Sequence, residues 1–160
     1  MFQKFNFTKF PPEDKPILVW DGECGFCKYW VTRWKEITAD KITFETYQEV
    51  ASNFPDIPVK EFKKASRLIT LEGTVHSGPD SAYMSYYIAN NASPWHRWYR
   101  DFKWFQKLSD HSYNYIAKNR SVFFKITKAM LGSNPLSFTH YWILYGCGTV
   151  LLLFLLLKIL

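Results

Sequence analysis

The 160-residue sequence has few cysteines and lacks the marks of a secreted scaffold. Its three cysteines are too few to hold a small secreted domain together by disulfides. The first residues contain no apolar run of signal-peptide length. The chain has no internal repeat and no low-complexity tract, and its length predicts one domain with one appendage.

Signatures of nucleic-acid binding are also missing, although the chain is basic. Its net charge of +6 and its pI of about 9.2 favour either nucleic acid or an anionic membrane surface as a partner. There is no arginine-rich arm, no zinc-finger spacing and no RNA-binding signature. We therefore expect no nucleic-acid partner.

Apolar and aromatic side chains are abundant. Hydrophobic residues make up 48% of the chain and aromatic residues 19%, which is enough to build a substantial core. Residues 17–20 form a run of β-forming residues that ends at Asp21-Gly22, and the pattern then changes to a helical period over residues 24–37. This order predicts a buried strand, a tight turn and a helix. The pattern next predicts a strand at 41–47, a loop with one helical turn at 48–64, and a hairpin of 68–71 and 75–76. Three helices are predicted after the hairpin, at 80–89, 95–108 and 112–131. Ser93-Pro94 is the expected cap of the second of these helices, and Ser109-Asp110 that of the third.

The one long apolar segment of the sequence is at the C-terminus. Residues 138–160 contain a single charged side chain, Lys158, and residues 152–157 have no polar face. A bilayer requires about 20 mostly apolar residues in a helix, and Tyr141 and Trp142 lie where an interfacial aromatic belt is expected. A buried core helix is the alternative, but we expect a single transmembrane helix that anchors the chain.

Charges near this segment predict its orientation. Basic side chains are frequent before the segment and rare after it, so the positive-inside rule keeps the soluble part on the cytoplasmic or mitochondrial-matrix side. A basic helix next to the membrane also suits anionic lipids. The basic residues before the segment are Lys118, Arg120, Lys125 and Lys128.

Cys24 and Cys27 form a C-x-x-C motif at the start of the first predicted helix. Unpaired backbone N–H groups and the positive end of the helix stabilise a thiolate on Cys24. Cys27 lies one turn deeper, from where it can close a small disulfide with Cys24. Cys24 is therefore the candidate nucleophile on a substrate disulfide, and Cys27 is the candidate thiol that resolves the mixed disulfide. Gly25 permits a tight turn and a close approach at this point.

Two acidic residues, Asp21 and Glu23, precede the motif. Their negative charge opposes a thiolate on Cys24, while the helix end favours it, so the net direction stays open. Asp21 could accept a proton from one thiol, or it could shape the turn by accepting hydrogen bonds from backbone N–H groups. Both roles remain open, and Asp21 joins Cys24 and Cys27 as a candidate catalytic residue.

A zinc site is the alternative use of the two cysteines. Zinc usually takes four ligands, often as two close pairs, and Cys24 and Cys27 supply only one pair. Cys147 lies in the apolar segment and is expected to pack there as a small side chain. The spacing therefore favours redox chemistry, without a metal or a bound cofactor. The other candidate ligands, none of them paired at short spacing, are His76, His96, His111 and His140.

The stretch WDGECGFC at residues 20–27 resembles the DCC family of predicted thiol–disulfide oxidoreductases, named for its Asp-x-x-Cys-x-x-Cys motif. Asp21, Cys24 and Cys27 occupy the three named positions. Residues 68–88 resemble the family's hairpin and the helix that follows it. Residues 113–124, with Asn119-Arg120, resemble its closing helix, so that the resemblance covers about residues 15–125.

This resemblance implies a thioredoxin-like fold with a redox-active Cys24–Cys27 disulfide. The resulting domain prediction is a lead-in at residues 1–14, a thioredoxin-like domain with a helical extension at 15–131, and a transmembrane helix at 138–160. One departure from thioredoxin concerns the cis-proline that precedes its third strand and faces its active site. The matching place here, Ala65-Ser66-Arg67, has no proline, which affects the expectations for peptide binding and redox poise.

Three functions are open. The first is a membrane-tethered thiol–disulfide oxidoreductase acting on a disulfide-containing protein or a small thiol. The second is a non-catalytic subunit of a membrane complex, for example a respiratory one, with the aromatic stretch at residues 95–105 as a contact surface. Packing of these aromatic residues against one helix face is the simpler explanation of that stretch. The third is a metal-binding module.

Overall fold

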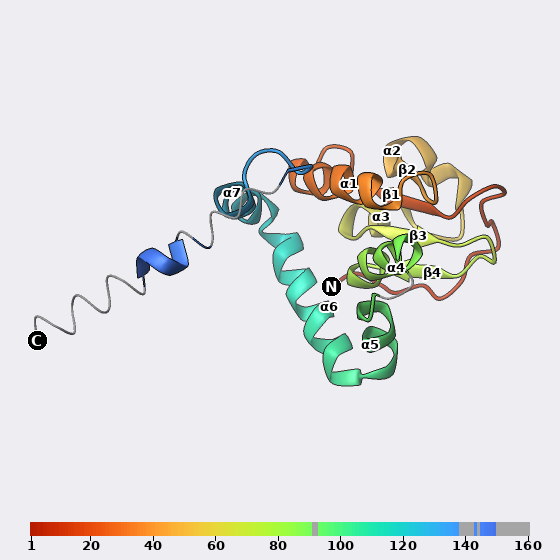
Figure 1. Ribbon diagram of the computed structural model, residues 1–160. Coiled ribbons are helices and arrows are strands. Elements are labelled where there is room, and N and C mark those ends of the chain that lie inside the picture. The colour runs from red at the N-terminus through yellow and green to blue at the C-terminus, as the bar shows by residue number, and fades with distance from the viewer. Residues whose placement is uncertain (91–92, 138–142, 144, 150–160) are drawn as a thin grey trace, which may run out of the picture.

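The computed structural model describes residues 1–90, 93–137, 143 and 145–149. Its centre is a four-stranded mixed sheet with the strand order β2-β1-β3-β4 (Figure 1). Strand β1 is parallel to β2 and antiparallel to β3, and β3 is antiparallel to β4. The strands are β1 (Ile17–Trp20), β2 (Thr43–Thr46), β3 (Arg67–Ile69) and β4 (Val75–Ser77). The prediction of an α/β fold with a small mixed sheet is confirmed.

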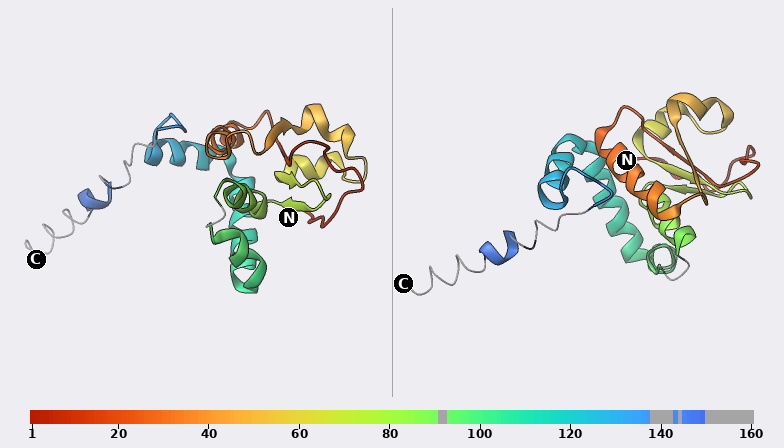
Figure 2. Two further views of the ribbon diagram at one scale, coloured as in Figure 1. Left: turned by 45° about the vertical axis from the view of Figure 1, so that its right-hand side comes forward. Right: turned by 45° about the horizontal axis from the view of Figure 1, so that its top comes forward.

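Helices connect the strands and continue beyond the sheet. The parallel pair β1 and β2 requires a crossover, which α1 supplies. After β4 the remaining elements are all helical, and the view in Figure 2 shows α7 beside α1. The helices are α1 (Gly25–Thr38), α2 (Tyr47–Val50), the 3-10 turn η1 (Ala51–Asn53), α3 (Val59–Lys64), α4 (Pro79–Ala89), α5 (Trp95–Asp101), α6 (Lys103–Lys118) and α7 (Arg120–Leu131).

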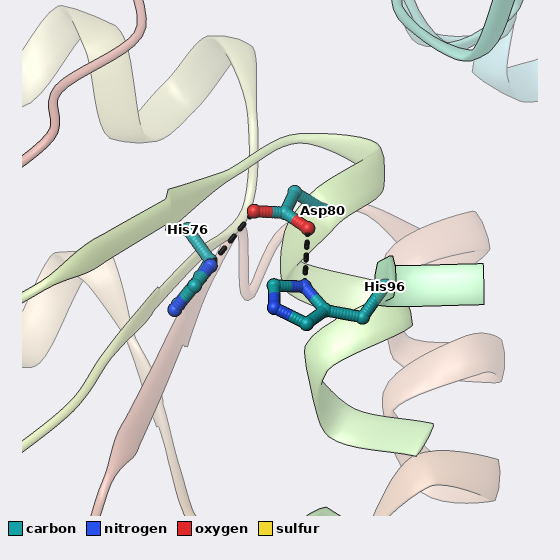
Figure 3. Close-up of side chains that lie close together, drawn as sticks. All are labelled: His76, Asp80 and His96. Carbon is teal, nitrogen blue, oxygen red and sulfur yellow. Dashed lines mark hydrogen bonds and ion pairs between the residues drawn. The ribbon is translucent and has the colours of Figure 1, made fainter. Parts of the chain in front are cut away.

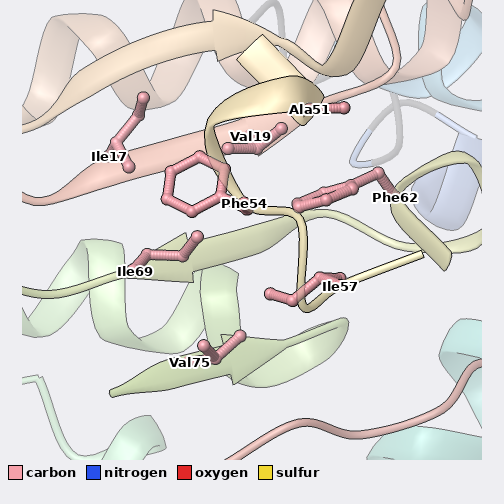
Figure 4. Close-up of a cluster of buried hydrophobic side chains, with 8 residues drawn as sticks. All are labelled: Ile17, Val19, Ala51, Phe54, Ile57, Phe62, Ile69 and Val75. Carbon is pink, nitrogen blue, oxygen red and sulfur yellow. The ribbon is translucent and has the colours of Figure 1, made fainter. Parts of the chain in front are cut away.

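Strand β1 is buried along its whole length and supplies both hydrophobic cores. Because successive side chains of a strand point to opposite faces, Ile17 and Val19 enter one core, and Leu18 and Trp20 enter the other. The first core packs against η1 and α3, where Phe54 and Phe62 contact each other with their rings 6.1 Å apart (Figure 4). The second core packs against α1 and α4. The sheet is therefore covered on both faces.

The first residues of the chain pack along the sheet edge formed by β4. The N–H of Val75 donates to the carbonyl of Asn6 at 3.1 Å, and the N–H of Thr8 donates to the carbonyl of Gly73 at 2.8 Å. Gly73 has φ +83°, a left-handed conformation that closes the β3–β4 hairpin and that glycine adopts without strain. The predicted lead-in is thus attached to the domain by main-chain hydrogen bonds.

The predictions for the middle of the chain were wrong at residues 48–64 and at the caps of the later helices. Three short helical elements, α2, η1 and α3, replace the predicted loop. Ser109 and Asp110 lie inside α6, because their side chains bond to tyrosines and do not cap a helix. The Tyr83 hydroxyl lies 3.1 Å from Ser109 Oγ, and the Tyr99 hydroxyl donates to Asp110 at 2.6 Å.

The helix breaks were also predicted at the wrong residues. The chain is extended at Phe102, between α5 and α6, and turns at Asn119, between α6 and α7. The side-chain amide of Asn119 donates to the carbonyl of Tyr115 at 2.8 Å, a local bond that ends α6. The strand at β1, the helix at α1, the β3–β4 hairpin, α4 and the stop at Gly132 are confirmed to within a few residues.

The predicted transmembrane helix falls mostly outside the described residues. Positions 138–142, 144 and 150–160 are not described, so the prediction at 138–160 stays a prediction. Within the part of the chain that is described, no helix combines the length and apolar character that a membrane crossing requires.

Phe62 offers a direct check of the first core. Its side chain is 1% exposed, so Phe62→Ala is expected to lower the free energy of unfolding by about 3–5 kcal/mol through lost apolar burial and the cavity left behind. Phe10 is 45% exposed, and Phe10→Ala is the matched control, expected to change stability by less than about 0.5 kcal/mol. Urea unfolding of the two variants measures the difference. Equal losses would contradict the assignment of Phe62 to the core.

Candidate functional site

Cys24 is the N-cap residue of α1, directly after the turn that leaves β1. Its backbone is extended, its carbonyl accepts the first helical hydrogen bond from the Lys28 N–H at 2.9 Å, and its Sγ accepts the N–H of Cys27 at 3.2 Å. A sulfur in this place accepts from the free N–H groups at the helix start. Both cysteines are free thiols and half-buried.

The two thiols have opposite acidities. The pKa of Cys24 is lowered from its ordinary value to about 6, chiefly because the Cys27 side chain donates a hydrogen bond to it. The Cys27 backbone N–H and the charge of Arg120 lower this pKa further, while burial and the charge of Asp21 oppose them. The pKa of Cys27 is raised by the same side-chain hydrogen bond and by burial. The sequence left open whether the pKa of Cys24 is raised or lowered. The structure shows that it is lowered, which favours a thiolate on Cys24 and a thiol on Cys27.

The carboxylate of Asp21, at the end of β1, is buried and accepts three hydrogen bonds. Its Oδ1 accepts the backbone N–H of Glu23 at 3.3 Å and the side-chain amide of Gln48 at 3.2 Å. Its Oδ2 accepts from the guanidinium of Arg120 at 3.0 Å. The bond to Glu23 is the turn-shaping contact expected from the sequence, and the other two bonds come from distant segments.

Arg120 fixes the start of α7 against the cysteine turn. Besides its bond to Asp21, its guanidinium donates to the carbonyls of Lys63 and Lys64 at 3.1 and 3.0 Å, which lie at the end of α3. One side chain thus links β1, α3 and α7. Its positive charge lies close enough to Cys24 to lower the pKa of that thiol.

Close packing of α7 on α1 explains the glycine of the motif. A Cβ atom on Gly25 would lie 3.1 Å from the ring of Phe124, which is tighter than most Cβ contacts. At the other end of the contact, the Tyr29 hydroxyl donates to the carbonyl of Gly132 at 3.0 Å. The close approach predicted for Gly25 is therefore made by a helix far along the chain.

An apolar cavity of about 520 Å³ opens beside the motif. Cys27 and Asp21 line it, while Cys24 is not among its lining residues. Most of the remaining wall is apolar or aromatic, and its aromatic residues from α1, α4 and α6 include Trp30, Trp34, Tyr83, Tyr86, Phe105 and Tyr113. Such a cavity suits the apolar part of a substrate.

Ser66 belongs to the stretch Ala65-Ser66-Arg67, which contains no proline. It lies directly before β3 and lines the cavity with Cys27. Its backbone N–H donates to the hydroxyl of Tyr113 at 3.1 Å, and its own hydroxyl lies 2.8 Å from that of Ser81. The backbone at Ser66 is thus bonded to α6.

The candidate zinc ligands do not meet at the motif. Among the described residues, neither Cys24 nor Cys27 belongs to a group of three or more potential metal ligands. Cys147 and His111 are exposed, and His140 lies outside the described residues. His76 and His96 come together with Asp80 in a group that contains neither cysteine, and this grouping was missed because each histidine was considered alone.

Arg120 was also missed, since the sequence analysis assigned it to the basic segment next to the membrane. The signal that could have revealed it is its place in the Asn119-Arg120 motif of the family resemblance. Gln48 and Tyr113 gave no such signal, because neither residue type is distinctive and each lies on a separate element.

Replacing Arg120 by Met tests the electrostatic part of the site. Loss of the positive charge is expected to raise the pKa of Cys24 above about 6, so that the thiol reacts several-fold more slowly with an alkylating agent near pH 6. Alkylation rates between pH 4 and pH 9 give the pKa. Arg100, whose side chain is 67% exposed and pairs with Asp101, provides the control Arg100→Met, which should leave the profile unchanged. An unchanged profile in Arg120→Met would contradict the role of this charge.

Comparisons with known proteins agree with this geometry. The family model of DCC1-like thiol-disulfide oxidoreductases matches residues 18–126, a range that contains the cysteine turn, the sheet, α4 to α6 and Arg120. Searches among curated proteins and among solved structures gave no match. The family match covers more than half of the 160-residue chain and includes the residues that hold the two thiols. The chain belongs to the DCC1-like thiol-disulfide oxidoreductase family.

Proposed function

We propose that this chain is a membrane-tethered thiol–disulfide oxidoreductase with Cys24 as nucleophile and Cys27 as resolving thiol. The observation that carries the proposal is the opposite shift of the two thiols, with the pKa of Cys24 lowered to about 6 and that of Cys27 raised. At neutral pH this leaves one thiolate ready to attack and one thiol in reserve. Membership of a thiol-disulfide oxidoreductase family supports the same chemistry.

The proposed reaction is a pair of thiol–disulfide exchanges. The Cys24 thiolate attacks a substrate disulfide, so that a Cys24–substrate disulfide forms, the substrate S–S bond breaks and the departing sulfur takes a proton from water. Cys27 then loses its proton and attacks Cys24 Sγ, which forms the Cys24–Cys27 disulfide and releases the second substrate thiol. Two electrons pass to the substrate. A small thiol returns the pair to its reduced form by the reverse exchange and is itself oxidised to a disulfide.

Asp21 is proposed to position the turn and to be a candidate acceptor for the Cys27 proton. Its contacts with Glu23, Gln48 and Arg120 support the positioning role, because all three donors hold the carboxylate in place. Proton uptake is compatible with its place beside Cys27 in the cavity wall. Within the described part of the chain, Oδ2 accepts a bond from Arg120 alone, which leaves a lone pair on that oxygen for a proton.

The thioredoxin-like assignment and the membrane tether are part of the proposal. The order strand, C-x-x-C, helix and the small mixed sheet support a thioredoxin-like core. The apolar residues 138–160 support a C-terminal anchor. Lys118, Lys125 and Lys128 are exposed, which suits an anionic surface on the cytoplasmic or matrix side. Arg120 is bonded to Asp21 and does not contribute to that surface.

A second candidate function is a non-catalytic subunit of a membrane complex. The observation that favours it is a group of exposed aromatic side chains on α5 and α6: Trp95, Trp98 and Trp104 are 44%, 41% and 64% exposed. Tyr99 of the same stretch is buried, so only part of the aromatic run packs inwards. Tryptophan is enriched at protein interfaces, where one exposed ring can bury a large area.

The oxidoreductase proposal predicts different outcomes for the two cysteines. Cys24→Ser is expected to abolish reduction of a model disulfide, because no nucleophile remains. Cys27→Ser is expected to accumulate a mixed disulfide with the substrate, because nothing resolves it. Non-reducing gel electrophoresis and mass spectrometry of the 160-residue chain in detergent detect the trapped species. Cys147→Ser is the control and should behave as the parent does.

Trapping of free thiols at graded glutathione ratios adds an equilibrium measurement. A two-electron transition that requires both Cys24 and Cys27 within the glutathione range is the expected result. The proposal fails if Cys24→Ser reduces the disulfide as fast as the parent, or if the two thiols stay unreactive over the whole range.

If the chain is a subunit of a membrane complex, it is expected to comigrate with that complex on a native gel. In membranes dissolved in a mild detergent, the chain should run with a complex far larger than itself on a native gel, and Trp104→Asp should release it by placing a charge in the interface. Phe10, which is 45% exposed and belongs to the N-terminal segment instead of α5 or α6, provides the control Phe10→Asp. A chain that migrates alone in every sample contradicts this function.

A further inference from the structure

Three side chains from separate elements lie close together beside β4. His76 lies on β4, Asp80 in the first turn of α4, and His96 in α5. Figure 3 shows the Asp80 carboxylate between the two imidazole rings, with one oxygen directed at each. The Nδ1 of His76 lies 2.7 Å from Oδ2, and the Nδ1 of His96 lies 2.8 Å from Oδ1.

The group is mostly shielded from water. The side chains of His76, Asp80 and His96 are only 12%, 14% and 13% exposed. The two imidazole rings also pack edge to face, with centroids 5.1 Å apart. Hydrogen bonds from both histidines lower the pKa of Asp80 against the opposing effect of burial, so the carboxylate is charged at neutral pH. A buried negative charge between two imidazoles is an arrangement that a cation stabilises.

We propose that His76, Asp80 and His96 form a binding site for a divalent transition-metal ion, with Zn²⁺ as the best-suited ion. One ligand atom from each side chain lies within 4.8 Å of the others. The site is separate from the two cysteines and does not depend on the oxidoreductase function.

The chemistry of the three ligands selects the class of ion. Two imidazole nitrogens suit zinc, copper, nickel and iron, whereas magnesium and calcium prefer oxygen ligands alone. A tetrahedral Zn²⁺ with bonds of about 2.0–2.1 Å holds its ligand atoms about 3.3 Å apart. The 2.7 and 2.8 Å hydrogen bonds run to different oxygens of Asp80 and have to open to admit the ion. Because one ligand atom from each side chain already lies within 4.8 Å of the others, the separations between ligand atoms change by at most about 1.5 Å.

The positions of the protons on the two histidines allow a metal ion to replace the hydrogen bonds to Asp80. The ionised carboxylate of Asp80 only accepts, so in the metal-free form each Nδ1 carries a proton and donates it to that carboxylate. Binding through Nδ1 requires that proton to move to Nε2 through solvent. The cation then takes the place of the two N–H donors. Three protein ligands leave a fourth position for water or another ligand.

An ion at this point would join the helical extension to the sheet. His96 belongs to α5, whereas His76 and Asp80 belong to the β4–α4 unit. Because an ion bound to the folded form alone stabilises that form by mass action, binding is expected to raise the Tm and to order α5 against α4. The packing of the Tyr87 ring on His96, with centroids 5.6 Å apart, would be fixed at the same time.

Zinc titration of a cysteine-free protein tests the site without interference from thiols. All three cysteines are replaced by Ser in the 160-residue chain, which is purified in detergent and freed of metal with a chelator. We expect about one Zn²⁺ per chain by competition with a chromophoric chelator, and a higher Tm in its presence. Co²⁺ should give the intense visible absorption of a four-coordinate site without a thiolate charge-transfer band.

Histidine variants in the same background locate the ion. His76→Gln and His96→Gln are expected to weaken Zn²⁺ binding at least about tenfold and to remove the Co²⁺ absorption. His111, which is exposed on α6, provides the matched control His111→Gln, which should bind as the parent does. Circular dichroism of the metal-free proteins checks that each variant is folded.

Two results overturn the proposal. One is the absence of Zn²⁺ binding and of a four-coordinate Co²⁺ spectrum in the folded cysteine-free protein, a result that does not rely on any histidine variant. The other is equal Zn²⁺ affinity in His76→Gln, His96→Gln and His111→Gln. Either result leaves the function of the cysteine pair untouched, because the cysteines are absent from every protein in the test.

Discussion

The ion pair between Asp21 and Arg120 is the constraint on which the cysteine site depends. The two residues are 99 positions apart, and their charged groups meet at 3.0 Å in a largely buried place. Without Arg120, the Asp21 carboxylate would be a buried negative charge beside a thiol that has to ionise, and both charges would be disfavoured. With it, Asp21 can shape the turn while the guanidinium supplies the positive charge that the thiolate needs.

The asymmetry of the two thiols comes from a single local geometry. Because Cys24 caps α1, its sulfur accepts from both the backbone and the side chain of Cys27, and the same contact lowers one pKa and raises the other. The deeper position of Cys27 also places it in the wall of the apolar cavity. In the proposed reaction, a substrate whose apolar part fills that cavity would therefore present its disulfide to Cys24, with Cys27 deeper in the site.

Local pattern was enough to predict β1, the cysteine turn and α1, because a buried strand and an amphipathic helix differ in period and their turn residues are adjacent. Asp21, Cys24 and Cys27 fall within that stretch, so they were found together. The helix breaks were not predictable, since tertiary contacts decide them: Ser109 and Asp110 resemble caps in sequence but bond to tyrosines in space. Spacing in sequence likewise gives no sign that Arg120 returns to the turn.

The helices after the sheet do more than extend the domain. Arg120 and Phe124 of α7 and Tyr113 of α6 reach the cysteine turn, its glycine and the residue before β3. His96 of α5 reaches the carboxylate at the start of α4. Each of these side chains therefore adds a contact to a group whose other members belong to the strands and helices before Asn90. The thiol chemistry is therefore not a property of the C-x-x-C motif alone, because a core cut at Ala89 would keep both cysteines and lose the cation that favours the thiolate.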